Sequence, residues 1–579
     1  MQQAKQPLLE KDLTLAELHA IPQEEFEALS VRNRYRLYFN HIGGANSVNP
    51  VPLLVIVYVM MGAIWASFFC HFVMDCSQDY FSDLNIKKFI LYNIAHGVLG
   101  FGATCGPLGT KNGLPVGVCG LTFLTPGTLC SPLFPGFVGC IQRTPGRRGF
   151  LAVLAFIAYL AALIYAIIDP TEMRRLYLVN GTFAIASVFD TVIFFASRGE
   201  HYGYHMICLM FPDWLAGCQW VQLMLWIDVG FSKCGPWFKY VVQVLAKDAF
   251  WSPFLPKHIA ARFWMKDWPR DCSPSRIAHC LGRMGAIGEW GFPLCAVFSP
   301  DSIISDFGVY GMIAYHAFIW LSLPTASVFE WQYYCMYMAY ALFKKNLFTF
   351  PTSPALIVFL VVVLLVLPII GQLEPKLVPF LMAYRQYSGN WRMGKIIMKK
   401  SARAKFEKIR TWSSIWWWEP ALKFLGGERM EYTIEGIFLS VPQFRGQFSV
   451  YEKFFKDTGK VDTDFYFIHS FCFMNAVFGW DLAVGWIWFR DCFREAIITI
   501  CGLEEGDCYF LQTEPVNVRP PHQMQIRLFD VVKGPLDAEV YVDIPYSSLE
   551  GTHPCDLHLD PAVMRKGKSI NGTFLTTYY

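Results

Sequence analysis

The chain has 579 residues, of which 54% are hydrophobic and only 16% are charged. A soluble domain carries about 25% charged residues, so this composition places the chain among membrane proteins. The formal net charge is +3, from 49 basic and 46 acidic residues, and gives no indication of nucleic-acid binding.

The N-terminal residues 1–50 are polar and predict an N-terminal arm, with a short amphipathic helix near residues 13–19. They contain no basic stretch followed by an apolar core. We therefore expect no cleavable signal peptide.

Apolar runs long enough to span a membrane follow the arm, since a spanning helix needs about 20 mostly apolar residues. The strong candidates are 51–74, 150–168, 176–197, 213–231, 303–323, 329–347 and 355–373. Two weaker candidates, 89–104 and 277–298, contain Gly, His, Arg or Glu. The sequence therefore predicts a polytopic α-helical membrane protein with seven to nine spans in a transmembrane domain, residues 51–375.

Residues 100–149 form an apolar segment rich in Gly and Pro, which cannot be a regular helix. Irregular backbone at membrane depth must be buried in protein or line a cavity. Two alternatives remain open: a re-entrant loop that shapes a pocket, or an ordered cap on the outside face.

Basic residues indicate the orientation in the membrane. The loop 256–276 and the run 376–410 are rich in Lys and Arg, so the positive-inside rule predicts that both lie in the cytoplasm. The run 376–410 is also amphipathic, and predicts either a segment on an anionic membrane surface or a solvated basic helix.

Residues 376–579 predict a basic membrane-proximal segment and a cytoplasmic α+β domain. The stretches "MQIRLFDVV" and "EVYVDI" alternate apolar and polar residues and predict a β-hairpin, with Val540, Val542 and Ile544 on one face. The apolar stretch 465–486 could enter the bilayer, but we expect it to form the core of this domain.

The 18 cysteines are scattered through apolar segments and show no CxxC or zinc-ribbon spacing. We expect free thiols, mostly buried, and leave the four cysteines of the Gly/Pro-rich segment open: Cys105, Cys119, Cys130 and Cys140. The sequence contains no GxxxxGK[ST], HExxH or GxSxG motif, so it predicts no metal site and identifies no cofactor.

Ionisable residues inside the predicted spans are the candidate functional groups, because charges at membrane depth are costly. In "MLWIDVGFSKCGPW", Asp228 and Lys233 are five residues apart and point about 140° apart on a helix, so they pair poorly. Lys233 could extend to the interface, whereas Asp228 needs a partner on another helix or a proton. Candidate partners are His96, Asp190, His201, His205, Arg283, Glu289, His316 and Glu330.

Five segments of the chain carry a resemblance to a known protein family: "CGPLGTKNGLPVGVCG", "LTPGTLCSPLFPG", "SRGEHYGYH", "HAFIWLSLPTASVFEW" and "YRQYSGNW". On these it resembles an uncharacterised, mostly bacterial family of polytopic transmembrane proteins of about this length. The resemblance implies a membrane fold and no established activity. A more distant similarity is to the membrane domain of the vitamin-K-dependent carboxylase, its horizontally transferred relatives and the DoxX-type redox proteins. It rests on "GFSK", "GEWGFP" and His316, and implies that Lys233 and Glu289 face a shared pocket.

Three functions are compatible with these observations. The first is an enzyme or redox component acting on a lipid-soluble substrate such as a quinone or isoprenoid, with Lys233, Glu289, His316 and Asp228 as acid–base groups. The second is a scaffold or assembly factor whose cytoplasmic domain binds a protein partner. The third is a transporter of a lipid or small molecule, although no internal repeat is visible. Membrane lipids are expected partners in all three.

Overall fold

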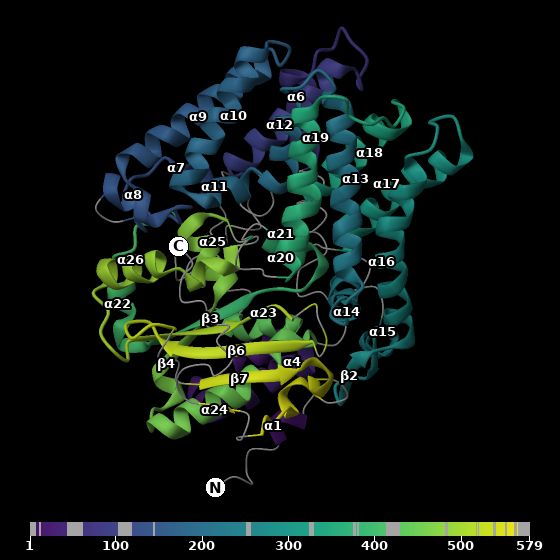
Figure 1. The fold of residues 1–579 in the computed structure, drawn as a ribbon. Coiled ribbons are helices and arrows are strands. Elements are labelled where there is room, and N and C mark those ends of the chain that lie inside the picture. Colours follow the sequence, from purple (N-terminus) through teal and green to yellow (C-terminus); the bar gives the residue numbers. More distant parts are fainter. Residues whose placement is uncertain are drawn as a thin grey trace.

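The computed structural model describes residues 7–10, 13–42, 62–101, 118–142, 145–249, 256–322, 329–373, 378, 381–412, 429–480, 484–516, 518, 520, 522–535, 540–549, 553–560 and 564–565. Long helices stand roughly upright in the upper half of Figure 1, and a β-sheet flanked by helices fills the lower half.

The helices of the upper half, which we call the bundle, follow the predicted spans. They are Gly62–Val73, α6 (Asp83–Val98), α9 (Phe150–Ile168), α10 (Met173–Phe189), α13 (Trp214–Lys233), α16 (Arg276–Ala296), α17 (Ile303–Ser322), α18 (Phe329–Ala339) with η5 (Tyr340–Lys344), and α19 (Pro354–Val361) with η6 (Val362–Val366) and α20 (Leu367–Leu373). Among the described residues, Phe150–Ile168 and Pro354–Leu373 are long and apolar enough to cross a membrane. The predicted number of seven to nine spans is not confirmed.

Exposed apolar side chains are concentrated on this bundle. Of the large apolar side chains that are exposed among the described residues, all but Trp412 and Val461 belong to residues 64–373. On α9, for example, Phe150, Ile157 and Ile168 are exposed while intervening residues are buried. A belt of this extent on one part of a molecule is typical of a surface covered by lipid.

Glycines allow the bundle helices to approach closely. A Cβ at Gly308 of α17 would lie 2.3 Å from the Ala296 nitrogen and 2.6 Å from the Phe292 carbonyl oxygen, both in the backbone of α16. A Cβ at Gly97 would lie 2.4 Å from the Ala196 carbonyl oxygen. Small residues at such crossings are characteristic of helix packing in membranes.

Hydrogen bonds and ion pairs identify the two ends of the bundle. At the end away from the sheet, the far end, Ser353 donates to the Asp213 carboxylate at 2.6 Å, and Lys345 lies 3.9 Å from Asp79. At the end beside the sheet, the near end, Gln372 donates to the Ser232 hydroxyl at 3.1 Å. Helix α13 therefore runs from the far end to the near end.

The chain also contains a return segment that the sequence did not reveal. Helix α10 ends at the near end, where the Leu133 amide donates to the Val188 carbonyl, whereas α13 begins at the far end. Residues 191–208 connect them as α11 (Thr191–Ala196), η3 (Gly199–Gly203) and α12 (Tyr204–Cys208), and most of their side chains are buried. The predicted span 176–197 is thus two helices that meet at Asp190, which caps α11 by accepting from the Val192 amide.

The described part of the Gly/Pro-rich segment forms an ordered cap at the near end. It contains α7 (Val118–Phe123) and α8 (Pro135–Ile141), and Asp190 fixes it by accepting from the Ser131 amide at 3.0 Å and pairing with Arg148 at 2.6 Å. Arg490, from the sheet-containing half, donates to the Ser131 hydroxyl. The cap thus lies at the same end of the bundle as the C-terminal region. The sequence predicted a cap on the outside face as one alternative and a cytoplasmic C-terminal region, and these two predictions exclude each other.

The connection from α13 to α16 contains α14 (Phe238–Asp248), α15 (Lys257–Trp264) and a hairpin of β1 (Met265–Asp267) and β2 (Asp271–Pro274). The rest of the lower half contains a six-stranded antiparallel sheet in the order β4-β3-β5-β6-β7-β8. Its strands are β3 (Met393–Lys399), β4 (Phe465–His469), β5 (Cys508–Thr513), β6 (Gln523–Asp530), β7 (Val540–Pro545) and β8 (Met564–Arg565), and its helices are α21 (Leu381–Ser388), α22 (Arg403–Phe406), α23 (Met430–Phe438), α24 (Gln447–Thr458), α25 (Ser470–Phe478) and α26 (Asp491–Cys501).

Both faces of the sheet are covered, because alternate residues of each strand point to opposite faces. Ile396 and Phe510 belong to the apolar core that includes α25 and the bundle, whereas Ile397 and Leu511 belong to the core with α23 and α24. The predicted hairpin is confirmed: β6 pairs with β7, and Val540, Val542 and Ile544 are buried. The stretch 465–486 is core, as expected, with β4 and α25 in its described part.

The basic run 376–410 differs from both alternatives that the sequence suggested. Residues 393–399 are the interior strand β3, paired on both sides, and the side chains of Arg385, Arg392 and Lys395 are buried. Buried counter-charges explain the difference, since Arg392 lies 2.6 Å from Glu514. A linear sequence cannot show such a partner.

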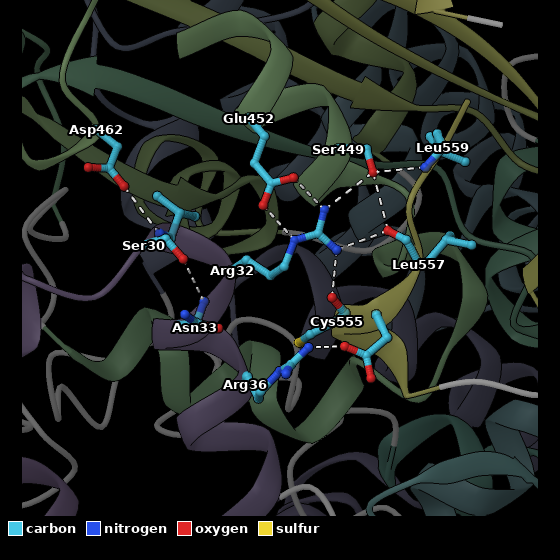
Figure 2. Close-up of polar contacts among 12 residues, drawn as sticks. Ser30, Arg32, Asn33, Arg36, Ser449, Glu452, Asp462, Cys555, Leu557 and Leu559 are labelled. Carbon is cyan, nitrogen blue, oxygen red and sulfur yellow. Dashed lines mark hydrogen bonds and ion pairs between the residues drawn. The ribbon is translucent and has the colours of Figure 1, made fainter. Parts of the chain in front are cut away.

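The N-terminal residues 13–42 pack into the lower half and do not extend as an arm. Helix α2 (Leu15–Ala20) begins with a capping box at Thr14, and α3 (Gln23–Glu27) and α4 (Val31–Ile42) follow. Figure 2 shows Arg32 of α4 donating to both Glu452 oxygens, each at 2.6 Å, and to the Cys555 and Leu557 carbonyls. The two ends of the described chain therefore share one core.

All 17 described cysteines are free thiols, and most are buried. Cys119 and Cys130 are buried in the cap, and Cys140 is exposed. The remaining open position, Cys105, lies outside the described residues.

Candidate functional site

Two of the four predicted site residues meet between α13 and α16. Lys233 forms an ion pair with Glu289, and Tyr315 of α17 bridges them, with its hydroxyl 3.2 Å from the Lys233 ammonium and 3.4 Å from the Glu289 carboxylate. The side chain of Lys233 is 4% exposed and that of Glu289 is 1% exposed. Lys233 does not extend to the interface. We call these three residues the Lys233–Glu289 centre.

Local sequence explains why the helices can meet there. Gly230 lets α13 approach α16, since a Cβ at this position would lie 3.2 Å from the backbone nitrogen of Trp290. Pro293 lies inside α16 and has no N–H, so the Glu289 carbonyl loses its intrahelical donor. The Glu289 Oε1 atom is buried and has no hydrogen-bond partner among the described residues. The centre therefore has at least one buried acceptor, Glu289 Oε1, without a hydrogen-bond donor among the described residues.

His316, the third predicted residue, is held in one neutral tautomer. The Trp226 indole donates to its Nε2 at 2.9 Å, so Nε2 carries no proton. Its Nδ1 then donates to the Gln332 side-chain oxygen at 2.6 Å. Both ring nitrogens are occupied, which makes His316 a packing and positioning group instead of an available base.

His201 repeats this arrangement one helix away. The Trp331 indole donates to its Nδ1 at 2.9 Å, and its Nε2 donates to the Gln222 oxygen at 2.8 Å. An indole N–H donates but cannot accept, so neither Trp226 nor Trp331 can relay a proton between the histidines. The buried polar interior predicted from the sequence exists, but it is not a proton-conducting chain through these residues.

Asp228, the fourth predicted residue, does not join the centre. It lies five residues before Lys233 on α13, on a different face, and its Oδ2 is buried with no hydrogen-bond partner among the described residues. No ion pair of Asp228 is found in the described part of the chain. The partner expected from another span is therefore not observed.

Sequence reasoning missed a second buried ion pair, formed by the return segment. Arg198 lies 3.0 Å from Glu330 and donates to the Tyr387 hydroxyl, which in turn donates to Glu200 at 2.7 Å. Arg198 has φ +48°, a left-handed conformation that is uncommon for a non-glycine residue. The charged run "SRGEH" between two apolar stretches was the available signal.

One cleft in the structure lies away from all four predicted residues. It is lined by N-terminal and sheet residues that include Glu27, Arg34, Lys400 and Arg429. Its cations already have partners: Lys400 lies 3.0 Å from Glu27, and Arg34 lies 3.1 Å from Asp462. We assign it no ligand.

A family model for a transmembrane protein of unknown function (DUF3556) matches residues 13–544. The chain belongs to this family. No curated protein and no solved structure matches the chain. The similarity to the carboxylase and DoxX group, with its shared pocket, stays a prediction.

Family membership makes the chain an integral membrane protein, which agrees with its belt of exposed apolar side chains. The matched range, residues 13–544, includes α2 to α4, the bundle and most of the sheet. Among the described residues, no three His, Cys, Asp or Glu side chains are grouped to hold a metal ion.

Proposed function

We propose that this protein binds the polar head of a lipid-soluble molecule, of the quinone or isoprenoid class, at the Lys233–Glu289 centre and exchanges a proton with it. The observation that carries the proposal is the buried Glu289 Oε1, which has no hydrogen-bond donor among the described residues and lies on a carboxylate paired with a buried ammonium group. Buried polar groups normally have partners, so unused ones mark a place for a ligand.

The position of the centre suits a ligand that arrives from the bilayer. Tyr315 is only partly buried, and Tyr310 and Phe318 on the same helix are exposed. Tyr315 is twelve residues from the far-end start of α17, or about 18 Å along the helix axis. A head group there would lie within the hydrocarbon layer, where hydrogen bonds to protein replace those to water.

The chemistry follows from the three side chains. A hydroxyl of the ligand would donate to Glu289 Oε1, and the carboxylate could accept that proton. The Lys233 ammonium and the Tyr315 hydroxyl would then stabilise the negative charge left on the ligand oxygen. His316 and Asp228, which the sequence also suggested as catalytic groups, have no role in this step.

The topology that we propose has ten passes through the bundle. The nine predicted spans would leave the two ends of the chain on opposite sides of the membrane. Residues 13–42 and 429–560 share one core, so the number of passes between them must be even. The return segment 191–208 supplies the tenth pass. Its charged side chains face protein, where irregular and polar backbone is tolerated.

We also propose that the near end, with the lower half of the molecule, faces the cytoplasm. The basic loop 256–276 lies at this end, as the positive-inside rule requires. The scaffold alternative lacks a comparable observation, because the described residues of 376–579 expose only two large apolar side chains, Trp412 and Val461.

The test is to purify the full chain in mild detergent and identify bound small molecules by mass spectrometry. The proposal expects a stoichiometric lipid-soluble molecule with a hydroxyl or carbonyl head, reduced at least tenfold by Glu289→Gln. Glu435→Gln is the matched control, because Glu435 is also buried and paired with a lysine, Lys395, but lies outside the bundle. Only bulk phospholipid in the wild type, or equal loss in both variants, would overturn the proposal and favour a scaffold.

A further inference from the structure

The outward side of α16 carries a row of exposed residues whose chemistry changes at one point. Arg276, Cys280, Arg283, Ile287 and Leu294 are exposed and lie within about 60° of one another around the helix axis. The near-end part of this row is basic, whereas beyond Arg283 it is apolar. We call it the α16 stripe.

The apolar part of the stripe belongs to the belt on the bundle. Met284, next to Arg283, is 65% exposed, Ile287 is 56% exposed and Leu294 is 44% exposed. The change from arginine to apolar residues marks the level where the hydrocarbon layer begins. Glu289 lies six residues further along, or about 9 Å deeper.

Helix α15 extends the basic part of the stripe. It contacts α16 at the near end, as Figure 1 shows, and its exposed residues Ile259, Arg262 and Phe263 have the i, i+3, i+4 spacing of one helix face. Two apolar side chains beside an arginine are typical of a helix that lies in the plane of the membrane interface.

The three arginines have no counter-charge among the residues that the structure describes. Arg262, Arg276 and Arg283 make no ion pair with any other described residue. Some cations at the far end do have such partners, since Lys344 pairs with Asp306 and Arg175 lies 2.6 Å from Glu172. Arg262, Arg276 and Arg283 are therefore available to an anion other than the described residues of the chain.

We propose that Arg262, Arg276 and Arg283 bind the phosphate of an anionic phospholipid, whose acyl chains lie along Met284, Ile287 and Leu294. Charge complementarity at head-group level and an apolar surface directly above it match the two halves of such a lipid. This inference rests on the proposed placement of α16 in the bilayer and is independent of any ligand at the Lys233–Glu289 centre.

The test compares lipid binding by native mass spectrometry of the full chain in detergent, titrated with phosphatidylglycerol or phosphatidylcholine. The wild type should prefer phosphatidylglycerol. Each basic side chain near a membrane surface contributes about a fivefold factor, so Arg276→Gln with Arg283→Gln should weaken phosphatidylglycerol binding about 25-fold and leave phosphatidylcholine unchanged. Equal binding of the two lipids by the wild type would overturn the proposal and point to an acidic protein partner.

Two further variants keep the result interpretable. Lys399→Gln with Lys456→Gln removes the same charge from exposed positions in the lower half and should leave binding within twofold. Arg276→Lys with Arg283→Lys retains the charge and should retain most of the preference. If the Lys399 and Lys456 control variant weakens phosphatidylglycerol binding as much as the Arg276→Gln, Arg283→Gln variant does, binding depends on the overall charge of the protein and the proposal fails.

Cys280 supplies a second readout within the stripe, because it is an exposed thiol between the two arginines of α16. Its alkylation, followed by peptide mass spectrometry, should slow when phosphatidylglycerol is added. Cys76 is exposed near the far end and should react at an unchanged rate. Equal protection of both thiols would contradict a site at the stripe.

Discussion

Replacing Lys395 by methionine should strongly destabilise the lower half of the molecule. Lys395 lies on the interior strand β3 with its side chain 2% exposed, and its ammonium donates to the Tyr35 hydroxyl at 2.6 Å. It forms an ion pair with Glu435 and lies 3.6 Å from Glu431. Methionine fills most of the same volume but removes the ion-pair partner of the buried Glu435 carboxylate.

The size of the effect follows from the burial of these carboxylates. Removing one partner of a buried ion pair costs about 3–5 kcal/mol. For a unit of this size, 1 kcal/mol corresponds to about 2–4 °C, so we expect the melting temperature to fall by roughly 6–20 °C. Lys395→Met combined with Glu435→Gln should recover part of the loss, because the double variant no longer carries the uncompensated charge of Glu435.

The pH dependence provides a sharper criterion. Burial raises the pKa of Glu435, and Lys395 acts against that rise. Without Lys395 the pKa should be higher still. A carboxyl whose pKa is raised by folding favours the folded state at pH values below its unfolded pKa, and this contribution is lost as the pH rises through the folded pKa. The deficit of Lys395→Met should therefore shrink when the pH is lowered from 8 to 5.

The assay is thermal unfolding in detergent, followed by tryptophan fluorescence and by proteolysis of the lower half. A melting temperature within 2 °C of the wild type would refute the reasoning. So would a deficit that grows as the pH falls, or a double variant less stable than Lys395→Met alone.

Three further substitutions test other parts of the structure. Gly308→Ala should separate α16 from α17 and lower the free energy of unfolding by about 1–3 kcal/mol, measured by melting in detergent. A Cβ at Gly291 would meet open space, so Gly291→Ala should leave the stability unchanged. Burial, with a smaller contribution from Arg36, lowers the pKa of His553 to about 4. The contribution of His553 to stability is therefore complete above pH 6.5 and is lost as the pH falls from 6.5 to 4. In His553→Gln, the melting temperature should depend less on pH over this range. Asp190→Asn leaves Arg148 buried without its counter-charge and should speed proteolysis of the cap at least fivefold, a result that a surface-exposed pair would not give.

The sequence predicted several bundle helices well, because their apolar runs are continuous. Helix α9 has the predicted bounds Phe150–Ile168, and α13 and α17 differ from prediction by one or two residues at their ends. The return segment 191–208 escaped because its surroundings are protein. Hydropathy detects contact with lipid, and a segment enclosed by other helices can carry Arg198 and Glu200.

The sequence identified two residues of the candidate site but did not predict that they form an ion pair. Lys233 and Glu289 stood out as charges in apolar runs, but only the helix crossing at Gly230 shows that they pair. His316 stood out for the same reason, but both of its ring nitrogens are hydrogen-bonded within the protein. Residue type indicates what a side chain can do, whereas its neighbours decide whether it is free to do it.

The shared core of the two chain ends imposes an order on biosynthesis. The ribosome makes α4 early, yet Arg32 binds Glu452 and the Cys555 and Leu557 carbonyls, and the Phe39 ring contacts His553, all in the C-terminal part of the chain. At about 5–20 residues per second, the roughly 390 intervening residues take about 20–80 s to make. During that interval the nascent N-terminal segment must be shielded by a chaperone or held near the membrane while the bundle inserts. A chain terminated before the sheet is complete would leave this segment exposed, which makes truncated products prone to aggregation.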